Sequence, residues 1–131
     1  MIKFFSNYKI FFYLMNLLLI FLYLFPGSIL GWIIYSDKRI QPQLTPDFII
    51  SSNHFYVFFL LSIIGFFTFI KTKIMNYLII YLISLSTILE IFHLFIPQRS
   101  FQWSDLFGNL FGVIFVIVLY ILINKYEHFK K

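Results

Sequence analysis

The chain has no cysteine and few charged residues. Of its 131 residues, 11% are charged and only five are Asp or Glu. The absence of cysteine excludes disulfide frameworks, thiolate zinc sites and thiol nucleophiles. So few charges leave too little polar surface to cover a soluble domain, while 61% of the residues are hydrophobic and 20 are Phe. We therefore predict a multi-pass integral protein of the cell membrane.

The net charge of +5 is small and is scattered over the chain ends and turns. This pattern suits contact with anionic lipid headgroups better than with nucleic acid. We expect membrane lipids to be partners, predict no nucleic-acid partner, and leave oligomer formation open.

Four apolar segments predict a single all-α domain over residues 1–131, a bundle of four transmembrane helices at about 8–25, 46–70, 74–96 and 105–123. Eighteen helical residues rise about 27 Å, which is just enough to cross the hydrocarbon core. We read the first segment as a span and not a signal peptide, because Phe25-Pro26-Gly27-Ser28 is not a small-x-small cleavage site.

Local patterns suggest how the segments are connected. Thr45-Pro46-Asp47 predicts a helix start, with Thr as the cap and Pro at the first helical position. Ser104 is expected to cap the last helix, and residues 28–35 form an interfacial segment or a loop. Residues 71–73 are predicted to form a basic turn, and 124–131 a basic tail.

Basic residues predict the orientation in the membrane. Seven of the ten lie in the N-terminal segment, the 71–73 turn and the tail. Because loops rich in Lys and Arg stay in the cytoplasm, both termini should be cytoplasmic. The connections before the second span and before the fourth should then face outward.

This topology gathers the polar residues in the extracytoplasmic half. Glu90 is the residue that most needs an explanation, because a charge near the middle of a bilayer costs about 3 kcal/mol or more. His54 should lie at a similar depth, so the two side chains could meet, and a separation within about 4 to 6 Å would let each influence the protonation of the other. Helical spacing places Glu90 and His93 on one stripe and Asp105 and Asn109 on another, and the two stripes predict a pocket.

Gly108 and Gly112 form a small-xxx-small pair on the last predicted helix. Such a pair lets two helix backbones approach closely. We interpret it as a packing motif.

The run Glu90-x-x-His93-x-x-x-Pro97-x-Arg99, then Asp105, Asn109 and Gly112, with His54 upstream, resembles the VanZ-like family of small membrane proteins, whose naming member is associated with teicoplanin resistance. The resemblance covers roughly residues 20–120 and implies a compact helical membrane domain of undefined activity, with a possible link to glycopeptide susceptibility.

The chain departs from the family pattern in two places. The family usually has Gln where this chain has His93, and commonly an Asp-Lys pair where it has Ile50 and Ser51. The first change keeps a hydrogen-bonding group, and the second removes a charged pair.

Each polar residue also has a structural interpretation. Glu90 could pair with Arg99 or accept hydrogen bonds from Ser86 and His93. Arg99 could reach lipid phosphates or bind an anionic ligand. Asp105 fits the dipole at the start of a helix, and Asn109 suits an interhelical hydrogen bond.

Three of these side chains are also of the types that bind metal ions. His54, Glu90 and His93 have the donor types of a zinc or iron site. Because the family usually has Gln at the position of His93, we predict no metal site and no cofactor.

The favoured function is binding of a lipid-linked or amphiphilic envelope molecule from the outer side. The expected ligand-binding residues are His54, Glu90, His93, Arg99, Asp105 and Asn109. One alternative is an enzyme acting on a lipid headgroup, with Glu90 and His54 as general acid and base. Another is a structural assembly partner whose polar groups only hold helices together.

Overall fold

The computed structural model describes residues 2–70 and 72–129, and within them every regular element is a helix. Their bounds are α1 Ile2–Leu24, α2 Ile29–Tyr35, α3 Ser52–Phe69, α4 Met75–Phe92 and α5 Trp103–Phe129. Lys71 of the predicted basic turn, and Lys130 and Lys131 of the predicted tail, lie outside the described residues.

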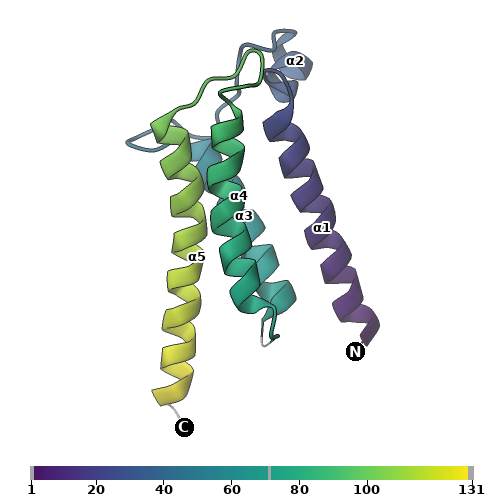
Figure 1. Ribbon diagram of the computed structural model, residues 1–131, viewed down its shortest axis with the longest axis vertical. Helices are drawn as coiled ribbons and strands as arrows, with labels where there is room; N and C mark the ends of the chain where they lie inside the picture. Colours follow the sequence, from purple (N-terminus) through teal and green to yellow (C-terminus); the bar gives the residue numbers. More distant parts are fainter. Residues whose placement is uncertain (1, 71, 130–131) are drawn as a thin grey trace.

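The four long helices run alternately up and down (Figure 1). Both ends of the described chain lie at one end of the bundle, together with the connection between α3 and α4. The short helix α2 and the two longer connections, 36–51 and 93–102, lie at the opposite end. α3 packs most extensively against α5, and α1 packs against α3 and α4.

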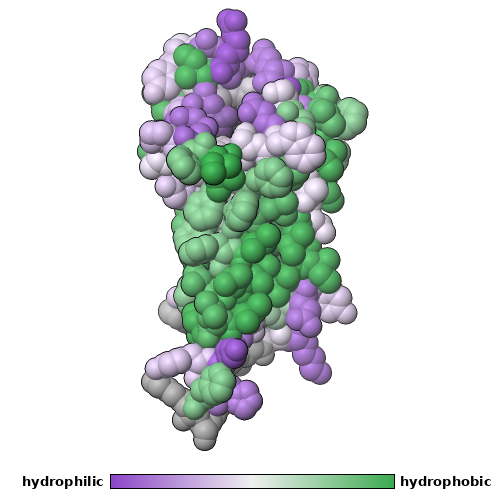
Figure 2. All heavy atoms as spheres, turned by 90° about the vertical axis from the view of Figure 1, so that its left-hand side faces the viewer, coloured by the Kyte–Doolittle hydropathy of each residue, from purple (hydrophilic) through white to green (hydrophobic). Residues whose placement is uncertain are grey.

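Three helices are long and apolar enough to cross a membrane: α3, α4 and the stretch Trp103–Tyr126 of α5. A fourth candidate is Tyr8–Leu24 of α1 together with α2, two segments that are bent by 76° at the break between them. Figure 2 shows an apolar band around the middle of one face, with hydrophilic residues at both ends. Only 33% to 44% of each of the three continuous windows is buried inside the chain, so most of their surface faces outward, as lipid contact requires.

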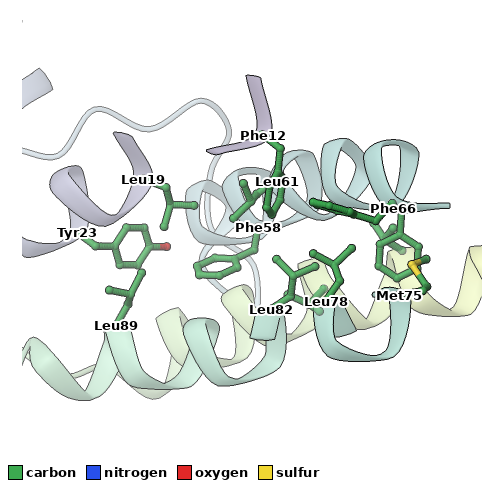
Figure 3. Packing of buried hydrophobic residues seen from close by; sticks show 13 residues of the cluster. Phe12, Leu19, Tyr23, Phe58, Leu61, Phe66, Met75, Leu78, Leu82 and Leu89 are labelled. Atoms are coloured by element: carbon green, nitrogen blue, oxygen red, sulfur yellow. The ribbon is translucent and has the colours of Figure 1, made fainter. Parts of the chain in front are cut away.

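An apolar core runs between the helices from Tyr23 at one end to Met75 at the other (Figure 3). Phe58 and Leu82 are fully buried at its centre. Phe12 and Phe69 pack edge to face, with ring centroids 5.4 Å apart, and join α1 to the lower half of α3.

The predicted helix start at Thr45-Pro46-Asp47 is wrong, since α3 begins at Ser52. Polar side chains hold the preceding segment in a non-helical form. The Asp47 carboxylate accepts the Ser52 backbone N–H at 2.8 Å, and the Ser52 hydroxyl donates to the Thr45 carbonyl at 2.6 Å. Asn53 donates to the Pro42 carbonyl at 2.7 Å. These bonds satisfy backbone groups that a helix would otherwise use.

The last helices also differ from their predicted bounds. α4 ends at Phe92 and not near residue 96, because the next turn tightens into i to i+3 bonds such as Phe95 N–H to the Phe92 carbonyl, and Pro97 disfavours helix at the residue before it. α5 begins at Trp103, so Ser104 lies inside the helix instead of capping it. The described part of the predicted basic tail continues α5 to Phe129.

Candidate functional site

Six polar side chains meet at the end of the bundle that carries α2. They come from α1, α3, α5, and α4 together with the residue that follows it. We call these six residues the polar cluster: Tyr23, His54, Glu90, His93, Asp105 and Asn109. All are buried except Asp105, which is partly exposed. The chain therefore brings together five of the six residues predicted to bind a ligand.

His54 is the centre of the polar cluster. Its Nδ1 lies 3.0 Å from the Tyr23 hydroxyl and 3.0 Å from Asn109 Oδ1. The same Nδ1 lies 3.9 Å from Glu90 Oε2, and Nε2 lies 3.5 Å from Asp105 Oδ2. His54 and Glu90 therefore do meet, and one imidazole faces two carboxylates.

Glu90 is fully buried and only half satisfied. Its Oε1 accepts the backbone N–H of Gln102 at 3.0 Å, whereas Oε2 accepts no hydrogen bond from the described residues. His93 Nδ1 lies 3.2 Å from Oε2, at ion-pair distance. The Ser86 hydroxyl donates to the Ile83 carbonyl instead of to Glu90, so that part of the structural interpretation is wrong.

His93 is anchored to the end of α1. Its Nε2 donates to the Tyr23 carbonyl at 3.1 Å, because a carbonyl oxygen only accepts. The ring also stacks on the Tyr23 ring, with centroids 5.6 Å apart and planes inclined by 18°. His93 therefore supplies a ring contact in addition to a hydrogen bond, so it is more than a replacement for the Gln amide that is usual in the VanZ-like family.

The two members of the polar cluster on α5, Asp105 and Asn109, have the structural contacts expected from the sequence and form further ones. Asn109 donates to the Ser86 carbonyl at 3.1 Å, which is an interhelical hydrogen bond, and its Oδ1 accepts the Tyr23 hydroxyl at 2.7 Å. Asp105 lies in the first turn of α5, where the helix dipole favours an acid, and it also contacts His54.

Arg99 lies beside the polar cluster, and its hydrogen bonds go elsewhere. Its Nη2 donates to the Leu22 carbonyl at 3.0 Å and its Nε to the Phe25 carbonyl at 3.3 Å. It thereby binds carbonyls at the end of α1, which a helix leaves unpaired. Burial lowers the pKa of the Arg99 guanidinium, which starts so far above neutrality that the charge remains. An ion pair of Glu90 with Arg99 is not among those formed by the described residues.

A groove opens onto the polar cluster. Its cavity has a volume of about 320 Å³ and lies between the end of α1, α2, the 41–44 segment and the start of α3. Leu22, Ile34 and Val57 are among its apolar lining residues, whereas His54 and Arg99 are among its polar ones. The groove therefore combines apolar walls with a polar, cationic end.

Two glycines of α5 set the distance to α3. A Cβ atom on Gly108 would lie 2.6 Å from the Ser51 carbonyl oxygen, and one on Gly112 would lie 2.6 Å from that of Phe55. The predicted close approach is confirmed. Because His54 lies one turn after the first of these contacts, the glycines also place its imidazole beside Asp105 and Asn109.

The sequence prediction missed Tyr23. A tyrosine near the end of an apolar segment is normally an interfacial residue, and nothing local distinguishes this one. Its hydroxyl and carbonyl bond to three members of the polar cluster. The available signal was its depth, because an antiparallel neighbour places residue 23 level with residues 54 and 90.

Three members of the polar cluster have the donor types for a metal ion. His54, Glu90 and Asp105 can each offer one ligand atom, and these atoms lie within 4.8 Å of one another. Asp105 thus takes the place of His93 in the set considered from the sequence.

Comparison with protein families, with curated proteins and with solved structures finds no match for this chain in any of the three. What the site does is therefore inferred from its own geometry, and the resemblance to the VanZ-like family stays a prediction.

Proposed function

We propose that the chain is a four-span protein of the cell membrane that binds the polar head of a lipid-linked or amphiphilic envelope molecule in the groove beside the polar cluster. The observation that carries the proposal is that mostly apolar walls lead to a buried imidazole and to a cationic guanidinium. An acyl or prenyl chain suits the apolar walls, and an anionic head suits the guanidinium.

The proposed topology has α1 with α2, α3, α4 and α5 as spans and both termini in the cytoplasm. Lys9 is in the first half of α1, Lys73 in the connection between α3 and α4, and Lys125 near the end of α5, all toward the end of the bundle that holds the termini. Lys38, Arg39 and Arg99 belong to the two longer connections at the opposite end. This distribution supports the orientation, because Lys and Arg remain on the cytoplasmic side. The groove would then open to the outer leaflet.

The groove can be tested by blocking it. Val57 lines the cavity, whereas Leu60, on the same helix, does not. We expect Val57→Trp to lower binding of a polyprenyl phosphate at least about tenfold, and Leu60→Trp to leave it unchanged. Native mass spectrometry of the full chain in detergent measures both, with phosphatidylglycerol as a second anionic probe. Equal binding of the polyprenyl phosphate by the two variants would refute the groove as the site.

Arg99 gives a test of the polar end. Arg99→Gln should weaken binding of the phosphate probe more than binding of the uncharged polyprenol of the same length. Arg99→Lys should keep part of the preference, because it retains charge without the planar fork. If wild type and Arg99→Gln discriminate equally between phosphate and alcohol, the guanidinium does not hold the head.

A role in glycopeptide susceptibility is part of the proposal and is supported by the resemblance to the VanZ-like family. The residues that carry this resemblance include five of the polar cluster, namely His54, Glu90, His93, Asp105 and Asn109. Expression of the wild-type chain should change the inhibitory concentration of teicoplanin for a susceptible host, and Val57→Trp at equal abundance should not. An unchanged inhibitory concentration with the wild-type chain would refute this part.

An enzyme acting on a lipid headgroup is the second candidate. It is favoured by His54, whose two ring nitrogens lie 3.9 Å and 3.5 Å from the carboxylates of Glu90 and Asp105. Imidazole and carboxylate pairs of this kind serve general acid and base catalysis. Lipid extracts from cells with the wild-type chain or with His54→Gln would differ in a headgroup species if the protein is an enzyme, and would match if it only binds.

A further inference from the structure

The polar cluster contains a carboxylate oxygen that its surroundings leave incomplete. Glu90 is fully buried, and its Oε2 has no hydrogen-bond partner among the described residues. His93 Nδ1 lies 3.2 Å from Oε2, but Nε2 of the same ring donates to the Tyr23 carbonyl, so in the neutral imidazole Nδ1 has no hydrogen to offer. The side chain is held in place, because Oε1 accepts the Gln102 N–H. A buried carboxylate oxygen without a proton or a cation is costly, so the position next to Oε2 calls for one of the two.

The hydrogen bonds around Asn109 determine which nitrogen of His54 is free. The Asn109 amide donates to the Ser86 carbonyl, so its Oδ1 points to the other side and accepts the Tyr23 hydroxyl. His54 Nδ1 lies 3.0 Å from the same oxygen and must therefore present a hydrogen to it. In the neutral imidazole the lone pair is then on Nε2.

That lone pair lies beside a second carboxylate. His54 Nε2 is 3.5 Å from Asp105 Oδ2, and the structure forms no hydrogen bond between them. Two ligands of a tetrahedral zinc ion, at bond lengths of about 2.0 to 2.2 Å, lie about 3.3 to 3.5 Å apart. The spacing of this pair matches that of two ligands of one ion.

We propose that the side chains of His54, Glu90 and Asp105 bind a divalent transition-metal ion, with Nε2 as the imidazole ligand. One ligand atom from each residue lies within 4.8 Å of the others, although the Glu90 carboxylate now approaches the ring from the side of Nδ1, 3.9 Å from Oε2. Side-chain shifts of about 1 Å would bring the three groups to the ligand spacing of one ion. Imidazole with carboxylates suits Zn²⁺, Mn²⁺ or Fe²⁺ and disfavours soft ions such as Cu⁺.

The surroundings of the three ligands fit this role. Asn109 and Tyr23 fix the tautomer and the ring orientation of His54, as groups behind a metal ligand commonly do. Because His54 also lines the groove, an ion can enter from there, and water from the groove can complete the coordination. The metal site does not depend on the amphiphile, and either can exist without the other.

The test uses the full chain purified in detergent micelles, stripped with chelator and then titrated with Zn²⁺ or Co²⁺. Bound metal is measured by mass spectrometry after dialysis, and Co²⁺ coordination by visible absorption. Asp105→Asn is the main variant, because its side chain is partly exposed and the amide preserves its shape. Asp37→Asn and His128→Gln are matched controls, since these residues lie outside the polar cluster.

The wild-type chain and both controls should bind one ion per chain with Co²⁺ bands of low coordination number, and Asp105→Asn should raise Kd at least about tenfold. His54→Gln should do the same, with circular dichroism as a check that it folds. The proposal fails if the folded wild-type chain retains no metal, or if Asp105→Asn binds Zn²⁺ as the controls do.

Discussion

Glu90 Oε1 accepts the backbone N–H of Gln102 at 3.0 Å, and this bond joins the end of α4 to the residue directly before α5. A buried carboxylate thereby fixes the connection that carries Arg99 and delivers Asp105 to His54. The structural and the ligand-binding interpretations of Glu90 consequently apply to different oxygens of the same side chain.

The two roles of Glu90 can be separated by substitution. Glu90→Gln keeps an oxygen for the Gln102 N–H, so it should cost less than about 1 kcal/mol of stability. Glu90→Ala leaves that N–H without a partner and opens a cavity, so it should cost about 2 to 4 kcal/mol. Thermal unfolding in detergent, followed by circular dichroism, measures both, with the outward-facing Ile91→Ala as control. Equal losses for Gln and Ala would show that the hydrogen bond to Gln102 is unimportant.

Gly112→Val should separate α5 from α3. A Cβ at this position would lie 2.6 Å from the Phe55 carbonyl oxygen and 2.8 Å from the Phe59 backbone nitrogen, and neither atom can move without its helix. We expect a loss of about 1 to 3 kcal/mol and lower abundance in the membrane. Ile114→Ala, at an outward-facing position of the same helix, should change neither quantity by a comparable amount. Normal stability of Gly112→Val would mean that the two helices are not packed as described.

Tyr23→Phe should loosen the polar cluster without disturbing the apolar core. The substitution keeps the ring that stacks on His93 and removes the hydroxyl that donates to Asn109. A loss of about 1 kcal/mol is expected, because one buried acceptor loses a donor. Tyr13→Phe on the exposed face of α1 is the matched control. Thermal unfolding of the two variants measures the difference, and identical midpoints would show that the Tyr23 hydroxyl does not stabilise the polar cluster.

The absence of cysteine makes the proposed topology directly testable. Ser100 and Lys73 are exposed and lie in connections at opposite ends of the bundle. In intact cells a membrane-impermeant maleimide should label Ser100→Cys and not Lys73→Cys, and both should react after the membrane is opened. The reverse labelling pattern would place the polar cluster on the cytoplasmic side.

Residues 46–70 and Glu90 show how far prediction from the sequence reached. An apolar helix in that interval was predictable, because hydropathy is a sum over neighbouring residues. Its start at Ser52 was not predictable, since the hydrogen bonds of Asp47, Ser52 and Asn53 hold the preceding residues in a loop, and these bonds depend on the path of that loop. That His54 and Glu90 could meet followed from their equal depth in the bundle. The hydrogen bond from the Gln102 N–H to Glu90 could not be predicted, because it depends on the path of the 93–102 connection.

The sequence by itself determined that this is an apolar helical protein with several segments long enough to cross a membrane, and that its buried acid and histidines belong to one end of it. These properties depend on composition and on rise per residue, which are local. Only the tertiary structure decided that Tyr23 joins the polar cluster, that Arg99 binds the end of α1, and that Asp105 completes a donor set with His54 and Glu90. These contacts depend on how the helices rotate and cross, which is set by packing between residues far apart in the chain, such as Gly112 against Phe55.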